Sequence, residues 1–156
     1  MAYQVAVCGP HDCSDAEAAQ AFRVGELLAD SGAVVLCGGG GGVMAAVAAG
    51  VRARNGLVVG IRPGGSRDGA SPDLSVTVLT NMGQARNAII VSSADAVIAI
   101  GGSWGTLSEV ALAMRRGALP VISLGGWQIS DAAGKPVAGV TVVQTPEDAV
   151  RAALAR

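Results

Sequence analysis

Residues 33–54, AVVLCGGGGGVMAAVAAGVRAR, hold the pattern on which the fold depends. The apolar run over 33–37 is typical of a strand that is buried on both faces, and the residues from 43 onward are typical of a helix. Five consecutive glycines join the two segments. Such a turn lets a ligand approach the backbone closely, and the helix N-terminus adds a partial positive charge. The stretch therefore predicts a strand–helix unit with an anion-binding turn.

The same alternation of short apolar runs and helical patterns covers the rest of the chain. Continuously apolar strands that alternate with helices favour a mostly parallel sheet with helices on both faces. No repeat or change of composition divides the chain, so 1–156 is predicted to be one α/β domain, three-layered and Rossmann-like, with about six or seven strands. We expect strands over 3–8, 33–37, 57–61, 76–79, 96–100, 120–124 and 140–143, and helices over 14–31, 43–54, 82–93, 106–117 and 145–156.

Composition limits the classes of partner. The chain is 51% hydrophobic and 15% charged, and its net charge of −1 with no basic run argues against a nucleic-acid partner. The N-terminus lacks the pattern of a signal peptide, and polar residues interrupt the longest apolar region, so neither secretion nor membrane insertion is expected. Cys8, Cys13 and Cys37 form no C-x-x-C pair and favour reduced thiols in a cytoplasmic protein. No metal and no cofactor are expected.

Ligands of such sheets bind at the carboxyl ends of the strands, where right-handed crossovers gather the strand-to-helix loops. The loop over 100–106, IGGSWGT, combines glycine amides with two hydroxyl groups. Neither this loop nor the glycine run has the Gly-Lys-Ser/Thr ending of a P-loop, so hydrolysis of a nucleoside triphosphate is disfavoured. The loops expected to form the site are 8–12, 37–44, 61–65 and 100–106.

The glycine run allows three interpretations. Gly40, Gly42 and Ala45 satisfy the dinucleotide pattern G-x-G-x-x-A, although five glycines in a row satisfy many such patterns. No acidic residue ends the following strand to hold a ribose, but Arg62 stands there and leaves an NADP-type site open. The second interpretation is close helix–sheet packing. Contact with a single phosphate or nucleotide is the interpretation we favour.

Two charged residues at this edge also have alternative interpretations. The sequence T-L-S-E has the spacing of a capping box, with Thr106 as the N-cap and Glu109 reaching back to its amide. The same position lets the Glu109 carboxylate bind a ribose hydroxyl, stabilise a developing cation or act on water. Arg86 stands near a helix start, where a cation opposes the helix dipole. Pairing with an anionic ligand or with Glu109 therefore competes with simple solvation of Arg86.

Taken together, these segments resemble the LOG (lonely guy) superfamily, also described as possible lysine decarboxylases. The resemblance extends from the first strand to about residue 124. The family pattern P-G-G-x-G-T-x-x-E is matched at Gly102, Gly105, Thr106 and Glu109. The family elements G-G-G-x-x-G-x-M and M-x-x-R-K resemble GGGGGVM (38–44) and MGQARN (82–87), with Arg86 in the place of the arginine.

The resemblance implies a homodimer or higher homo-oligomer that binds a small phosphorylated ligand. It also implies hydrolysis of the N-glycosidic bond of a nucleoside 5′-monophosphate to free base and ribose 5-phosphate, with Arg86 and Glu109 as the catalytic pair. Lysine decarboxylation is not implied, because no lysine is placed to anchor pyridoxal phosphate. The residues expected to bind the ligand or its phosphate are Gly9, Gly39, Gly40, Gly41, Gly42, Met44, Gly101, Gly102, Ser103, Trp104, Gly105 and Thr106.

Three departures from the family pattern point to a second function. Gly101 replaces the proline, Ser103 replaces the third glycine of the motif, and Asn87 replaces the lysine after the arginine. These features resemble the short subgroup that includes molybdenum-cofactor carrier proteins, which bind a phosphorylated pterin without transforming it. Phosphoribohydrolase activity is the leading expectation, and binding or carriage of a phosphorylated heterocycle is the alternative.

Overall fold

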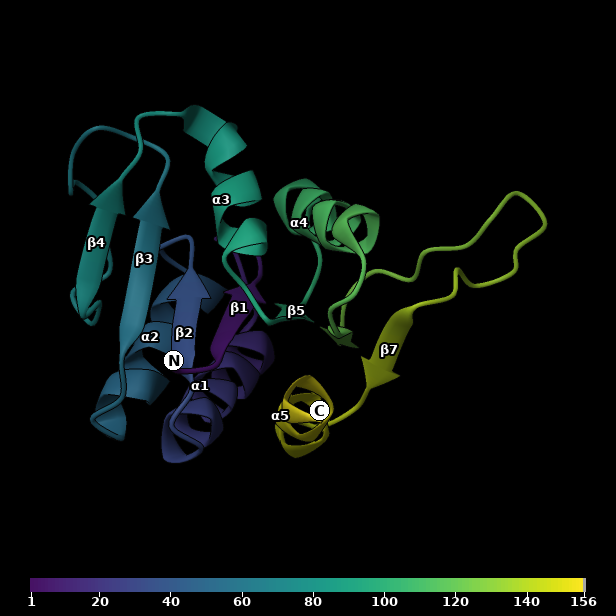
Figure 1. Ribbon diagram of the computed structural model, residues 1–156, viewed down its shortest axis with the longest axis horizontal. Coiled ribbons are helices and arrows are strands. Elements are labelled where there is room, and N and C mark those ends of the chain that lie inside the picture. Colours follow the sequence, from purple (N-terminus) through teal and green to yellow (C-terminus); the bar gives the residue numbers. More distant parts are fainter. Residues whose placement is uncertain (156) are drawn as a thin grey trace.

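The computed structural model describes residues 1–155 and contains a seven-stranded sheet in the order β4-β3-β2-β1-β5-β6-β7 (Figure 1). Every pair of neighbouring strands is parallel. The predicted α/β fold is confirmed, and each strand lies within one residue of its expected range. The strands are β1 (Gln4–Cys8), β2 (Val34–Cys37), β3 (Val58–Arg62), β4 (Val76–Leu79), β5 (Ala96–Ile100), β6 (Val121–Leu124) and β7 (Val140–Val143).

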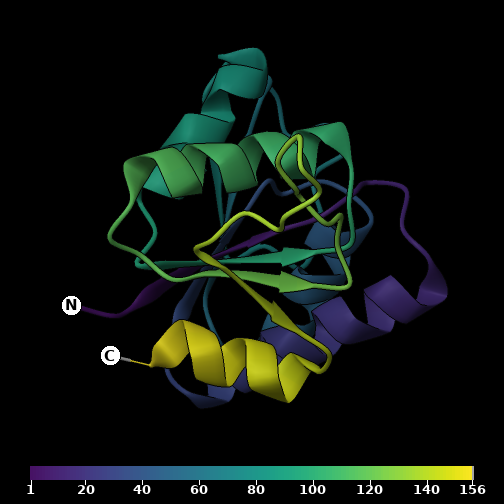
Figure 2. The ribbon, with the colours of Figure 1, turned by 90° about the vertical axis from the view of Figure 1, so that its right-hand side faces the viewer.

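Helices cover both faces of the sheet (Figure 2). One face carries α1 (Asp15–Asp30), α2 (Val43–Ala53) and α5 (Pro146–Leu154), and the other carries α3 (Arg86–Ser92) and α4 (Trp104–Arg116). Alternate residues of β1 enter the two cores: Val5 and Val7 pack on the first side, and Ala6 and Cys8 on the second. The thiol of Cys8 therefore points toward the α3–α4 layer. No helix within residues 1–155 is both long and apolar enough to cross a membrane.

The starts of two helices differ from prediction. A short 3₁₀ turn, Gly83–Ala85, occupies part of the expected helix over 82–93, and α3 begins only at Arg86. Helix α4 begins at Trp104, and its N-cap is Ser103 instead of Thr106. Ser103 has extended backbone angles, and its hydroxyl oxygen accepts a hydrogen bond from the Thr106 amide at 3.2 Å. Serine is a strong N-cap, so the helix gains almost a full turn before Thr106.

The capping-box interpretation of Glu109 is therefore wrong. Glu109 lies in the second turn of α4, too far along the helix to reach an N-cap amide. A true capping box is present in α1, where the Glu17 amide donates to Ser14 Oγ at 3.1 Å and the Ser14 amide donates to Glu17 Oε2 at 3.0 Å. The side chain of Glu109 therefore does not cap α4 and is free for another role.

The glycine at position 42 is required by the path of the chain at the start of α2. Gly42 has φ of +62°, and a Cβ atom there would overlap the main-chain carbonyl oxygens of Pro10 and His11. We expect Gly42→Ala to lower the free energy of unfolding by about 2 kcal/mol or more, measured by urea denaturation. Gly32→Ala is the control, because Gly32 also has positive φ, +77°, but no atom within 4 Å of its Cβ position. Equal losses in the two variants would contradict a role for close packing.

Candidate functional site

A cleft lies at the point where the strand order of the sheet reverses. From β1 the chain proceeds outward through β2, β3 and β4, and from β5 it proceeds the other way through β6 and β7. The loops after β1 and β5 therefore diverge and leave a crevice at the carboxyl ends of the strands. Its volume is about 190 Å³, and we call it the switch-point cleft. It is lined by Val7, Cys8, Gly9, Pro10, His11, Gly38, Met44, Gln84, Arg86, Asn87, Ser103, Gly105, Thr106 and Glu109.

The guanidinium group of Arg86 is fixed by the ends of two strands. Its Nη1 donates hydrogen bonds to the carbonyl oxygens of Gly38 at 2.7 Å and Ile61 at 2.6 Å, and its Nε donates to Asn87 Oδ1 at 2.8 Å. These carbonyls offset the unfavourable place of a cation at a helix start. Burial lowers the pKa of Arg86, but a guanidinium remains charged at neutral pH. The cleft therefore contains a positive charge in a fixed orientation.

Asn87 connects Arg86 to helix α4. The Asn87 side chain is buried, and its Nδ2 donates to Ser108 Oγ at 3.1 Å. The Ser108 hydroxyl in turn donates to the carbonyl oxygen of Gly105 at 2.7 Å. The lysine expected from the family pattern is thus replaced by a neutral amide that links α3 to the first turn of α4. This link orients the arginine relative to that turn.

Glu109 is a buried carboxyl group in the cleft, with 8% of its surface exposed. Burial raises its pKa from 4.5 to about 7, whereas a hydrogen bond with the Cys8 thiol and the positive charge of Arg86 act in the opposite direction. Both protonation states are therefore populated near neutral pH. Such a group can accept or donate a proton in contact with a ligand.

The first turn of α4 presents its amide groups near this carboxyl. Ser103, Gly105 and Thr106 line the cleft, and the Ser103 and Thr106 hydroxyl oxygens lie 3.0 Å apart in a hydrogen bond. The amides of Trp104 and Gly105 have no intrahelical acceptor, because they precede the first complete turn. Together with the helix dipole they favour an anion at this end.

The glycine run after β2 is instead packed against other parts of the chain. The Val43 amide, at the start of α2, donates to the Pro10 carbonyl oxygen at 3.1 Å. A Cβ on Gly41 would lie 2.6 Å from Cε1 of His11, and one on Gly39 would lie 3.0 Å from Cα of Gly60. Close packing within the protein is sufficient to explain these glycines. Of the two helix starts, that of α4 contributes Ser103, Gly105 and Thr106 to the lining of the cleft, and that of α2 contributes Met44.

The structure brings together about half of the residues predicted from sequence. Gly9, Met44, Arg86, Ser103, Gly105, Thr106 and Glu109 line the switch-point cleft. Gly39, Gly40, Gly41, Gly42, Gly101, Gly102 and Trp104 are outside its lining, and their binding of a ligand stays a prediction. Cys8, Pro10 and His11 lie in the loop 8–12 that was expected to form the site, although none was named as a binding residue, and sequence reasoning did not assign Gln84 or Asn87 to the site. The only available signal was their position, next to β1 or beside Arg86.

The fold and the cleft define a class of Rossmann-like α/β proteins, and the chain belongs to the SLOG cluster4 family, whose model matches residues 2–150. This confirms the LOG-like resemblance deduced from the motifs. A protein of Archaeoglobus fulgidus is 42% identical over 150 residues, which are 94% of this chain and 91% of the relative.

Solved structures narrow the resemblance to a particular subgroup. The molybdenum cofactor binding protein of Rippkaea orientalis is 32% identical with a TM-score of 0.86, and the match covers 97% of this chain and 94% of that chain. The Moco carrier protein of Chlamydomonas reinhardtii is 28% identical with a TM-score of 0.84, over 97% of this chain and 95% of that chain. Both confirm the resemblance to molybdenum-cofactor carrier proteins.

Proposed function

We propose that the protein binds a small phosphorylated heterocycle in the switch-point cleft and releases it unchanged. The observation that carries this proposal is the convergence of the fixed Arg86 guanidinium and the first turn of α4 on one cavity. These groups suit a phosphomonoester, which carries about two negative charges and several acceptor oxygens at neutral pH. The names of two similar proteins, which refer to the molybdenum cofactor, make a phosphorylated pterin the first ligand to test.

The inner wall of the cleft suits the ring system of such a ligand. Glu109 and Cys8 are buried there and hydrogen-bonded to each other, and Ser103 and Thr106 add hydroxyl groups to the lining. A pterin edge carries both hydrogen-bond donors and acceptors. A carboxyl group with a pKa of about 7 complements such an edge in either protonation state.

Paired ligands test the proposal directly. We expect a phosphorylated pterin to bind to one site per chain in isothermal titration calorimetry, and its dephosphorylated counterpart to bind at least about tenfold more weakly. Chromatography of the released ligand should recover it intact. Equal affinity for the two pterins would contradict a phosphate site, and chemical conversion of the bound pterin would contradict carriage.

Hydrolysis of a nucleoside 5′-monophosphate is the second candidate, and Glu109 is the observation that favours it. In this reaction the bond from C1′ to the base nitrogen breaks, the base leaves with the electron pair and gains a proton, and water oxygen bonds to C1′. The protonated Glu109 carboxyl would first supply the proton that the leaving base gains. The resulting carboxylate would then stabilise the positive charge at C1′ and accept the proton that the attacking water loses.

Incubation of the protein with AMP, GMP, CMP and UMP tests this second activity. If this activity is present, chromatography should detect free base with the wild-type protein. We expect this release to disappear in Glu109→Gln, because a neutral amide neither stabilises the cation nor transfers the proton. Absence of free base with all four nucleotides would leave carriage as the function. Release of base by Glu109→Gln at the wild-type rate would exclude Glu109 as the catalytic group.

Two further expectations belong to the proposal. A homodimer or higher homo-oligomer is implied by the resemblance and is measured by light scattering after gel filtration. A cytoplasmic location is supported by the free thiols of Cys8, Cys13 and Cys37.

A further inference from the structure

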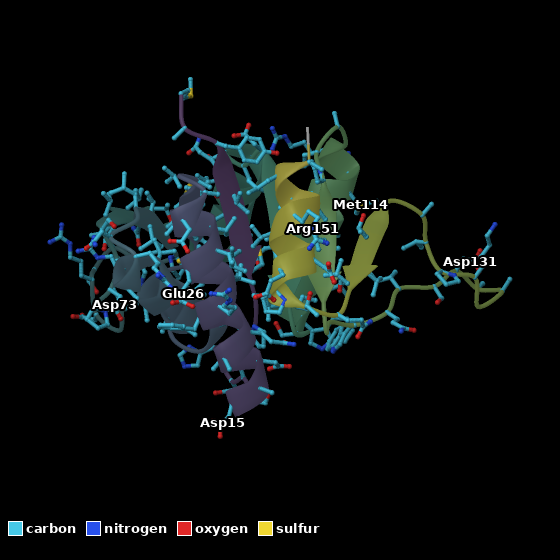
Figure 3. All side chains as sticks on the ribbon, turned by 90° about the horizontal axis from the view of Figure 1, so that it is seen from below. Asp15, Glu26, Asp73, Met114, Asp131 and Arg151 are labelled. Carbon is cyan, nitrogen blue, oxygen red and sulfur yellow. The ribbon has the colours of Figure 1, made fainter. Side chains whose placement is uncertain are left out.

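A second cavity, of about 290 Å³, lies beside the switch-point cleft on the far side of the α4 cap. It is lined by β5, β6 and β7 of the sheet, by α4, and by the segment 125–139, which we call the arm. The arm leaves the sheet after β6 and extends outward before it returns as β7 (Figure 1). Asp131, at its outer end, lies far from the helices in a second view (Figure 3). We call this second space the arm cavity.

The wall of the arm cavity is held in place by a tryptophan. Trp127 packs over the main chain of Gly102, where a Cβ atom would overlap its indole ring. Its ring also forms an edge-to-face pair with Trp104, with centroids 5.0 Å apart and planes at 85°. A bridge between Ser130 and Pro136 closes the arm into a loop. Position 102 therefore requires a glycine because the indole ring of Trp127 occupies the space that a side chain would need.

The lining of the arm cavity is apolar and uncharged. Ala99 and Val142 lie on the sheet, Val110 lies on α4, and Ile129 and Val137 lie on the arm. No lining residue has a charged side chain, and hydroxyl and amide groups are the only polar side chains in the lining. Transfer of an unpaired anion into such a space is strongly unfavourable. Ser103 and Thr106 line both spaces, but the arm cavity lacks the charged groups of the switch-point cleft.

The shape of the arm cavity identifies the kind of occupant. Its volume is close to the lower limit of small-molecule sites, roughly 300 Å³, and about twice that of an engineered cavity that binds benzene. The space is concave, with the sheet, α4 and the arm on its sides, and a concave apolar space of this size suits a compact molecule. From these observations we infer that the arm cavity is a second binding site, for an uncharged apolar molecule with up to three aromatic rings. This inference does not depend on the ligand of the switch-point cleft.

The neutral dye N-phenyl-1-naphthylamine is a suitable probe for this site. Trp104 and Trp127 are the only tryptophans in the chain, and Trp127 lines the arm cavity. We expect the dye to bind to one site per chain, to gain fluorescence and to be excited by energy transfer from these tryptophans. Inorganic phosphate and AMP should not displace it. Absence of saturable binding, or displacement by phosphate or AMP, would overturn the inference.

Two valines of similar exposure provide a matched pair of variants. Val137 in the arm cavity is 39% exposed, and Val78 on β4 at the other sheet edge is 41% exposed. Val137→Asp should weaken dye binding at least about tenfold, because it adds a carboxylate to an apolar wall, whereas Val78→Asp should leave the affinity unchanged. Equal affinity in the two variants would overturn the inference.

Two controls separate this site from a defect in folding or assembly. The circular dichroism spectrum and thermal midpoint of each variant report the fold, and Val142→Asp, at another exposed wall position, gives an independent second test with the same expected loss. Light scattering reports the molar mass of each variant. A lower mass for Val137→Asp than for Val78→Asp would show that a second copy covers the arm cavity, and would overturn the small-molecule site.

Discussion

Arg86→Met should weaken the binding of a phosphorylated pterin by about 100-fold, equivalent to roughly 3 kcal/mol, with little change for the dephosphorylated counterpart. The guanidinium is the charged donor of the switch-point cleft, and hydrogen bonds with the strand-end carbonyls of Gly38 and Ile61 fix its position. Methionine keeps much of the side-chain length but supplies neither charge nor donors. Calorimetric titration of both ligands measures the difference.

Arg116→Met is the matched control for this substitution. Arg116 also donates from Nη1 to two carbonyl oxygens, those of Val91 and Ala94, each at 2.6 Å, but it lies in the last turn of α4, outside the cleft. Both variants therefore lose the same kind of structural hydrogen bond, so the difference in affinity between them isolates the contact with ligand. Similar affinities in the two variants would contradict a ligand-binding role for Arg86.

A lysine at the same position tests whether charge alone is sufficient. The ammonium group of Arg86→Lys keeps the charge but lacks the planar fork that reaches Asn87 and both carbonyls together. We expect its affinity for the phosphorylated pterin to lie between that of the wild type and that of Arg86→Met. Wild-type affinity in the lysine variant would show that orientation by Asn87 contributes nothing.

The arrangement of strands could be predicted because it depends on local pattern. The apolar runs at the centre of the sheet, such as Val34–Cys37 and Ala96–Ile100, are buried on both faces or nearly so, and no tertiary contact competes with that pattern. The position of Arg86 at a helix start also suggested its role, since a cation there requires a reason. The structure provides that reason in two carbonyl groups, that of Gly38 just after β2 and that of Ile61 near the end of β3.

The parts that could not be predicted depend on contacts between segments that are distant in sequence. Whether α2 or α4 presents its amides to the cleft depends on the loop at Pro10, whose carbonyl oxygen accepts from the first amide of α2. No pattern near residue 43 contains this information. The contact of Glu109 with Cys8 likewise depends on where α4 begins. Ser103 and Thr106 are both residue types that favour the N-cap position, so the sequence alone does not decide which of them is the N-cap.

Glu109→Gln should make the protein more stable at pH 8, by up to roughly 3 kcal/mol, and remove a loss of stability that the wild type undergoes as pH rises. Burial raises the carboxyl pKa from 4.5 to about 7, so the folded protein binds a proton in this range that the unfolded chain releases. The stability associated with the protonated carboxyl is fully present below pH 4.5 and is lost as pH rises through 7. Glutamine is close in shape and does not ionise.

The measurement is the free energy of unfolding of both proteins by urea denaturation from pH 4.5 to 8. The decisive quantity is the change with pH of the difference between them, because altered contacts of the amide affect all pH values alike. Glu147→Gln is the control: a hydrogen bond from Arg23 lowers the pKa of Glu147, which is therefore ionised throughout most of this range, and the difference should stay nearly constant. A constant difference for Glu109→Gln as well would contradict the raised pKa. A growing difference would show that the chain retains, at a cost in stability, a carboxyl group that packing alone does not require, as expected for a group that acts on a ligand.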